Sequence, residues 1–207
     1  ASVNLDRLGD ALLAARDKTN ALAAFEESLA IKRKLADVNL ADRGRQRELS
    51  VTLNKVGDAK LRASDGPGAL AAYEESLTIM RRLVAADPAN ALWQRDVTVS
   101  LDRVGDAQLS INDRSAALTA YEESLGIRRK LAGADPGNAG WQMDSAVALY
   151  KVSTASDPQR ARSILQEAVD LLEALAREKK LAGPQLSWLA ALQRQLAKLT
   201  AATIADK

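Results

Sequence analysis

Apolar residues recur at intervals of three and four along the chain, in stretches that come in pairs. In the best-defined pair, the apolar positions of the first stretch are Val99, Leu101, Val104, Ala107 and Leu109, and those of the second are Ala117, Tyr121, Leu125, Ile127 and Leu131. This spacing is that of one face of an α-helix. Turn-forming residues separate the stretches at 64–68, 87–88, 112–115 and 135–137. The pattern therefore predicts an all-α chain of helix pairs, with Asn90 and Asn138 as helix N-caps.

The helix pair repeats with a period of 48 residues. The segments LDRLGDA, LNKVGDA and LDRVGDA begin at residues 5, 53 and 101, and the segments FEESL, YEESL and YEESL follow in step at residues 25, 73 and 121. Residues 51–98 and 99–146 are identical at 27 of 48 positions. Shared helical composition does not produce this agreement, so the repeats indicate duplication of one structural unit.

These residues resemble the tetratricopeptide repeat (TPR) family. Its small first-helix residue is matched by Gly9, Gly57 and Gly105, its small second-helix residue by Ala21, Ala69 and Ala117, and its aromatic residue by Phe25, Tyr73 and Tyr121. Two features depart from the family: Ser28, Ser76 and Ser124 stand where alanine is usual, and the unit has 48 residues in place of 34. The added residues make about four helical turns, which lengthen both helices while keeping their apolar faces in phase.

The resemblance implies an all-α, TPR-like α-solenoid, in which antiparallel helix pairs form a right-handed superhelix. Similar long-helix units occur in kinesin light chains and in bacterial TPR sensor and adaptor arrays, and the alanine-rich composition also suggests a bacterial source. The resemblance assigns every aromatic residue except Tyr150 to packing between helices, including Trp93, Trp141 and Trp188.

We expect four units, at about residues 1–40, 41–88, 89–136 and 137–183, followed by a C-terminal capping helix and tail at 184–207. The fourth unit is degenerate, since Ser153 replaces the repeated glycine, and such a unit suits the end of a solenoid. In the first unit, Leu40 and Arg45 replace the linker proline and the tryptophan, and no cap precedes it. We therefore expect the chain to be part of a larger protein or complex.

The composition disfavours several classes of function. The chain of 207 residues has neither cysteine nor histidine, which removes the usual zinc ligands and the commonest general acid and base. Asp102 and Asp106 lie four residues apart without further converging carboxylates, so we expect no catalytic residue, metal site or cofactor. The net charge of +2 offers no field for nucleic acid or an anionic membrane, and no stretch has the ~20 apolar residues of a span. We expect a soluble, cytoplasmic protein that is not an enzyme.

The resemblance implies that the first helices line a concave groove in which partners bind. The candidate partner-binding residues there are Asp10, Asn54, Asp58, Leu61, Arg95, Asp102, Asp106, Leu109 and Tyr150. This face is acidic in its middle and apolar at its margins, which suits a protein or peptide with basic residues. The alternative is that pairs three residues apart, such as Lys55 with Asp58 and Arg103 with Asp106, form only a solvated lattice.

The function that these features predict is a protein–protein interaction module. The alternative is a self-assembling structural element that uses the uncapped N-terminal repeat edge. The glutamate doublets at 74–75 and 122–123 lie beside a core aromatic residue of the second helix. They are predicted to form a solvated face or to contact the neighbouring repeat.

Overall fold

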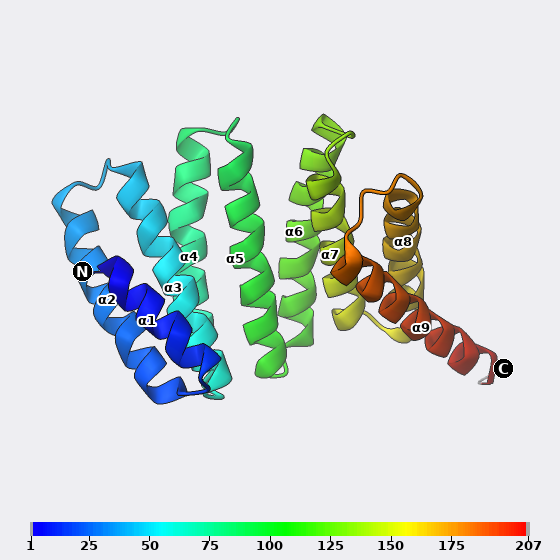
Figure 1. Ribbon diagram of the computed structural model, residues 1–207, viewed down its shortest axis with the longest axis horizontal. Helices are drawn as coiled ribbons and strands as arrows, with labels where there is room; N and C mark the ends of the chain where they lie inside the picture. Colours follow the sequence, from blue (N-terminus) through cyan, green and yellow to red (C-terminus); the bar gives the residue numbers. More distant parts are fainter. Residues whose placement is uncertain (1, 206–207) are drawn as a thin grey trace. The chain divides into compact units, whose positions relative to one another are not determined.

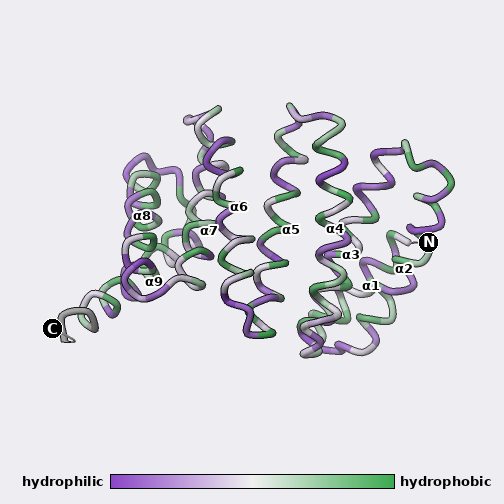
Figure 2. Tube along the Cα trace, turned by 180° about the vertical axis from the view of Figure 1, so that it is seen from behind, coloured by the Kyte–Doolittle hydropathy of each residue, from purple (hydrophilic) through white to green (hydrophobic). Residues whose placement is uncertain are grey.

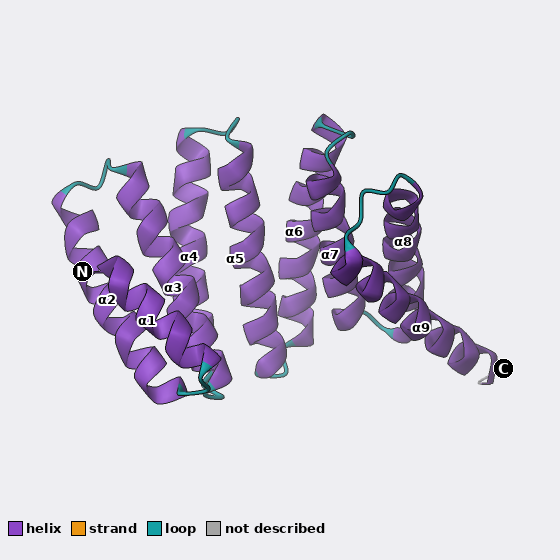
Figure 3. Cartoon of the chain, in the orientation of Figure 1, coloured by secondary structure: helices purple, strands orange, loops and turns teal. Residues whose placement is uncertain are grey.

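The computed structural model describes residues 2–205, with side chains described for residues 2–201. All regular structure within this range is α-helical (Figure 1, Figure 3). The helices are α1 (Ser2–Ala14), α2 (Lys18–Val38), α3 (Arg43–Arg62), α4 (Gly66–Ala86), α5 (Ala91–Ser110), α6 (Arg114–Ala134), α7 (Ala139–Ala155), α8 (Pro158–Arg177) and α9 (Gly183–Ala205). The prediction of an all-α chain is confirmed. The helices group into two compact units, Ala1–Ala117 and Leu118–Lys207.

In the first unit each helix packs on the next along the chain from α1 to α5, and α3 also contacts α5. Consecutive helices run antiparallel (Figure 1), and apolar and hydrophilic residues alternate along each of them (Figure 2). Phe25 and Tyr73 are fully buried in this core. A Cβ atom would lie 2.4 Å from the Phe25 ring if placed on Gly9, and 2.3 Å from the Tyr73 ring if placed on Gly57. The first helix therefore needs glycine where the aromatic ring of the second helix crosses it.

In the second unit α7 packs on α8, and α8 packs on α9. Leu149 and Val152 of α7 meet the buried apolar face of α8, which includes Leu165 and Leu172. Helix α9 adds the buried residues Leu189 and Leu192. The helix that the sequence predicts after Gly183 thus exists, and it packs against the last helix pair.

Most helices of the chain begin at an Asx cap, where a side-chain oxygen accepts a first-turn amide hydrogen bond. The predicted caps Asn90 and Asn138 are confirmed. Aspartates take the same role at Asp17, Asp42, Asp65 and Asp157. At two of these caps, Asp17 and Asp65, the preceding residue has a positive φ, 63° at Arg16 and 65° at Ser64.

The predicted break at 64–68 is too long, because α4 already begins at Gly66. The carboxylate of Asp65 accepts a hydrogen bond from the Gly68 amide, and Pro67 fits the first turn because its missing amide hydrogen is not needed there. A Cβ atom on Gly66 would lie 2.6 Å from Ser110 Oγ, so this glycine also permits close packing on the end of α5.

The tryptophans lie at the margin of the core. Trp93, Trp141 and Trp188 are half-buried and do not lie in the fully buried core. Each lies within the first two turns of its helix and so close to the loop that precedes this helix. The guanidinium of Arg43 lies 5.9 Å from the centre of the Trp93 ring, so this indole carries a cation on its face.

Candidate functional site

Most of the predicted partner-binding residues lie on the first helices of the first unit, α1, α3 and α5. We call the side of these helices that carries Asp10, Asn54 and Asp58 the first-helix face. Asp10 is exposed, and Asp58, Leu61, Asp106 and Leu109 are half-buried. Arg95 is exposed, whereas Asn54 and Asp102 are buried. The sequence-predicted set therefore mixes surface residues with residues enclosed between helices.

Ion pairs cross the first-helix face from one helix to the next. Lys55 Nζ of α3 lies 2.5 Å from Asp10 Oδ2 of α1, and Arg47 Nε of α3 lies 2.6 Å from Asp96 Oδ2 of α5. Arg103 of α5 reaches back to Asp58 of α3 with Nε and Nη2, at 3.0 and 3.2 Å. The predicted pairing of Lys55 with Asp58, three residues along the same helix, is wrong. Basic side chains of α3 and α5 lean toward the carboxylate of a neighbouring helix instead.

Asp58 is held by two helices at once. Besides Arg103, it accepts a hydrogen bond from the Tyr73 hydroxyl of α4, at 2.7 Å. Burial, and then the hydrogen bond to Asp58, raise the pKa of Tyr73 well above its ordinary value. Burial opposes the charge of Arg103, but its hydrogen bonds and its attraction to Asp58 outweigh this and raise the pKa of the guanidinium. Asp58 is therefore a structural anchor as well as a surface carboxylate.

A pocket of about 170 Å³ opens between α3, α4 and α5. Its apolar lining comes from Val51, Met80 and Val99, and Asn54 adds an amide. Asn54 Nδ2 donates a long hydrogen bond, 3.4 Å, to Ser100 Oγ. The buried Asn54 Oδ1 has no hydrogen-bond partner among the described residues. A buried acceptor without a donor is costly, so this atom stands out chemically on the first-helix face.

The other predicted residues are distributed differently. Asp10 and Asp58 line a shallow pocket of about 780 Å³ with Arg16, Lys18 and Arg62 near the turn that follows α1. Tyr150 belongs to the second unit, where its ring packs edge-on against Trp188 of α9 with centroids 6.0 Å apart. Helix α9 thus covers part of the only aromatic side chain that the sequence assigned to the groove.

A buried lysine on α2 escaped the sequence analysis. Lys32 Nζ lies 2.6 Å from Asp6 Oδ2 of α1 and 2.6 Å from Thr52 Oγ1 of α3. Ser28 contacts Asp6 Oδ1 at 2.7 Å, which completes the group. One signal was present: the position 48 residues after Lys32 holds Met80, so this position belongs to the interior face of the helix.

The serines that depart from the family pattern also make specific contacts. Ser76 Oγ donates to the carbonyl oxygen of Ser50 at 3.0 Å and lies 3.2 Å from Ser100 Oγ. Ser28 makes the corresponding contact with the Ser2 carbonyl oxygen at 3.2 Å. In the first two repeats the hydroxyl thus ties the second helix to the backbone of the first helix, which alanine cannot do.

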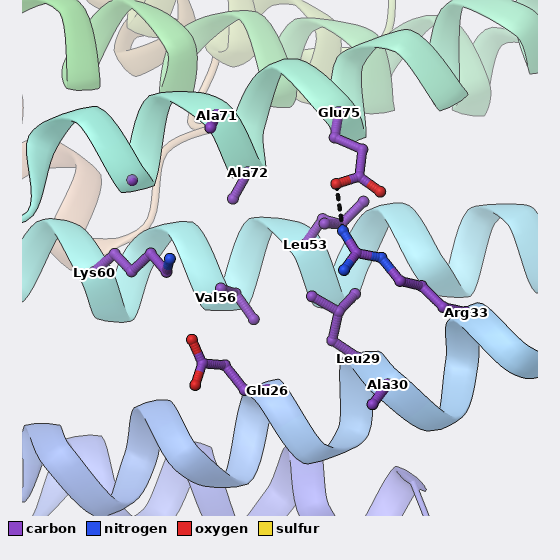
Figure 4. Close-up of a pocket in the computed structure, with 11 residues that line it drawn as sticks. Glu26, Leu29, Ala30, Arg33, Leu53, Val56, Lys60, Ala71, Ala72 and Glu75 are labelled. Carbon is purple, nitrogen blue, oxygen red and sulfur yellow. Dashed lines mark hydrogen bonds and ion pairs between the residues drawn. The ribbon is translucent and has the colours of Figure 1, made fainter.

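A third pocket, about 370 Å³, lies between α2 and α4 over α3 (Figure 4). Leu53 and Val56 form part of its floor, and Arg33 of α2 reaches Glu75 of α4 across it at 2.5 Å. In the second unit Arg160 of α8 pairs with Glu122 of α6. The prediction that the glutamate doublets contact a neighbouring repeat is confirmed for Glu75 and Glu122.

The described part of the chain contains no cluster of three or more acidic side chains that could hold a metal ion, with histidine and cysteine absent from the sequence. None of its helices is long and apolar enough to cross a membrane. Among the described residues, the first-helix face offers pockets, paired charges and the unsatisfied amide oxygen of Asn54.

Comparison with known proteins gives structural neighbours only, since no family model and no curated protein matches the sequence. BtubC (BKLC) from P. vanneervenii is 15% identical with a TM-score of 0.69, and the alignment covers 95% of this chain and 72% of that one. TPR-like repeats of kinesin light chain type from Podospora anserina are 15% identical with a TM-score of 0.59, covering 98% and 95%. Yeast Hif1, a histone chaperone described as a scaffold that recruits protein complexes to core histones, is 13% identical with a TM-score of 0.58, covering 96% and 94%. The chain therefore has the all-α fold of tetratricopeptide-like repeat proteins.

Proposed function

We propose that the protein is an interaction module that binds a peptide or a segment of another protein on the first-helix face. The observation that carries the proposal is the pocket lined by Val51, Asn54 and Val99, beside which the buried Asn54 Oδ1 has no donor among the described residues. An extended segment would donate a backbone amide hydrogen to this oxygen and place an apolar side chain between the two valines. The unsatisfied acceptor would then become satisfied only in the complex.

Basic residues in the partner remain part of the proposal. Asp10 is exposed and its pair with Lys55 is partly open to solvent. Such exposed pairs contribute only about 0–1 kcal/mol, so a partner's lysine or arginine could replace Lys55 at little energetic expense. A partner's cation would replace the internal contacts of Asp58 less easily, because Tyr73 and Arg103 both bind this carboxylate. The contribution of partner charge should therefore be concentrated at Asp10.

The remaining predictions about organisation are proposals as well. We propose that the units divide at about residues 40, 88, 136 and 183 and that α9 serves as the C-terminal cap. We also propose that Leu61, Arg95, Asp102, Leu109 and Tyr150 extend the binding surface beyond the Asn54 pocket. A role without catalysis, in the cytoplasm, completes this reading.

Site-specific photocrosslinking tests the binding surface. A benzophenone amino acid replaces Val51 on the first-helix face in one variant and the exposed Thr78 on α4 in a matched control. After irradiation in a lysate of the source organism, we expect a discrete crosslinked partner from position 51 and none from position 78. Equal crosslinking from both positions, or crosslinking from position 78 alone, would contradict the proposal.

Self-association is a second candidate, and one observation favours it. Leu8 of α1 is 50% exposed, whereas Val56, its equivalent in the next repeat, is 3% exposed because it packs toward α2. A second copy of the chain that covered Leu8 would remove this apolar surface from water. Sedimentation equilibrium would then give a mass that rises with concentration for the wild type and stays at the monomer value for Leu8→Glu. A constant monomer mass for the wild type would exclude this candidate.

A further inference from the structure

The turn between α2 and α3 carries apolar side chains that its counterparts lack. Val38 is 80% exposed and Leu40 is 73% exposed. The corresponding residues one repeat later are Ala86 and Pro88, and those of the third repeat are Ala134 and Pro136. Large apolar side chains at this turn are thus a property of the first repeat and not of the repeated unit. Burial against another molecule would recover the cost of exposing them.

Leu40 stands at the edge of a pocket of about 430 Å³ formed with the last turns of α4. Ile79 and Leu83 of α4 line this pocket and are buried beneath it. The charged residues of the lining are both arginines, Arg43 from the start of α3 and Arg82 from α4. The pocket therefore combines an apolar floor, an exposed leucine and a positively charged rim.

The two rim arginines differ from three other arginines of the first unit. Arg33, Arg47 and Arg103 each pair with a carboxylate of another helix. By contrast, neither Arg43 nor Arg82 has an ion-pair partner within the described part of the chain. Arg43 is instead held over the Trp93 ring, which fixes its charge beside the pocket. Two cations without counter-charges beside one pocket fit a ligand that brings carboxylates.

We propose that this surface, which we call the turn pocket (Leu40, Arg43, Ile79, Arg82 and Leu83), docks an acidic segment of a partner protein. The segment would insert one large apolar side chain against Leu40, Ile79 and Leu83, and its flanking carboxylates would pair with Arg43 and Arg82. This surface is separate from the Asn54 pocket, because the two share no lining residue. The inference goes beyond the proposed function and stands or falls independently of it.

The test uses a short fluorescein-labelled synthetic peptide with leucine and phenylalanine flanked by glutamates. Two control peptides carry glutamine or lysine in place of glutamate. Fluorescence anisotropy should give tightest binding for the acidic peptide, and the advantage should shrink as salt is added, because the rim charges are screened. Amide chemical shifts of residues 40–46 and 79–86 should move on addition of the acidic peptide.

Paired variants separate this site from unspecific binding. Leu40→Ala should weaken the acidic peptide about tenfold, whereas Leu92→Ala, which removes a leucine 65% exposed on α5 and outside the pocket, should not change its affinity. Arg82→Gln should weaken it about threefold, and Arg162→Gln, which removes an exposed arginine of α8, should have no effect.

Three results would overturn the proposal. The first is equal affinity for the acidic, neutral and basic peptides, and the second is an equal loss for Leu40→Ala and Leu92→Ala. The third is a set of shifts confined to residues around Val51 and Val99, which would assign the acidic peptide to the first-helix face. That last outcome would leave the proposed function standing while removing this inference.

Discussion

Two junctions of the first unit are built from equivalent positions of the duplicated repeat, yet they use different chemistry. The first junction joins α1, α2 and α3 through Asp6, Ser28, Lys32 and Thr52. The second joins α3, α4 and α5 through Asn54, Ser76, Met80 and Ser100. The serine of the second helix reaches the first-helix backbone in both. The first junction encloses a full ion pair, whereas the second is neutral and leaves Asn54 Oδ1 without a donor among the described residues.

The comparison teaches that the buried cation and the buried anion of the first junction depend on each other and are replaced together in the next repeat. Lys32 and Asp6 are both largely buried, so each charge is tolerable only because the other is present. Where the repeat holds methionine instead of lysine, it also holds asparagine instead of aspartate. The neutral version avoids a buried charge, but the amide then has more hydrogen-bonding capacity than its neighbours satisfy.

The largest expected effect is the removal of one partner of the buried ion pair. Asp6→Asn leaves the Lys32 ammonium buried without its counter-charge and should lower the free energy of unfolding by about 3–5 kcal/mol, or release α1. The double variant Asp6→Asn with Lys32→Met copies the second junction and should recover most of this loss. Urea unfolding followed by circular dichroism measures both. A double variant as unstable as Asp6→Asn alone would show that the two junctions are not interchangeable.

The next effect concerns the glycines below the aromatic rings. Gly57→Ala places a methyl group 2.3 Å from the Tyr73 ring in the second junction and should destabilise by about 1–3 kcal/mol despite the better helix propensity of alanine. Gly9→Ala makes a similar clash with Phe25, but within the described chain the main packing of α1 is on α2, with an ion pair to α3, so α1 can move more easily and the loss should be smaller.

A matched control for these glycines lies on α6. Nothing would come within 4 Å of a Cβ atom on Gly126, so Gly126→Ala should stabilise by about 0.5–1 kcal/mol through helix propensity alone. If Gly57→Ala were as favourable as Gly126→Ala in thermal unfolding, the close contact with Tyr73 would not limit the packing.

The sequence was sufficient for the helix pairs because their determinants repeat. Ala21 and Ala69, Phe25 and Tyr73 are buried at matching places, so periodicity alone identifies the core. The sequence was not sufficient for the charges of the first-helix face. Lys55 has carboxylates available on its own helix and on α1, and which one it reaches depends on the distance between helices. That distance is a result of packing, which a pattern along one helix does not contain.

The burial of individual polar side chains was the second feature that the sequence did not predict. The sequence pattern does not single out Lys32, because lysine is almost never buried without a partner and its partner lies 26 residues away on another helix. The candidate site was affected in the same way: Asn54 and Asp102 were placed correctly on the first helices, but their burial was not foreseen. Comparison of equivalent positions in successive repeats, Lys32 with Met80, would have revealed the interior position.

A smaller effect tests the aromatic residues of the two junctions. Tyr73→Phe removes the hydrogen bond to Asp58 and should cost about 1–2 kcal/mol, since the carboxylate is partly exposed. Phe25→Tyr could offer the same bond to Asp10, but that carboxylate is open to solvent, so the gain should stay below about 0.5 kcal/mol. Urea midpoints of both variants compare the junctions directly.

The hydrogen bond between Tyr73 and Asp58 makes the free energy of unfolding depend on pH. Because the folded state raises the pKa of Tyr73, its contribution to stability is fully present below the ordinary tyrosine pKa of about 10 and is lost as the pH rises above it. The difference in unfolding free energy between wild type and Tyr73→Phe should therefore shrink above pH ~10. A difference that stayed constant through this range would mean that the phenol does not donate to Asp58.

The smallest effect on stability should accompany the largest effect on binding. Asn54→Leu removes the unsatisfied oxygen and one long hydrogen bond while roughly keeping the side-chain volume, so unfolding should change by no more than about 1 kcal/mol in either direction. If the oxygen serves a partner's amide, crosslinking from position 51 should nevertheless fall sharply in this variant. Undiminished crosslinking would remove Asn54 from the binding surface. A stability loss of several kcal/mol would instead mean that the second junction depends on this amide, as the first depends on Asp6.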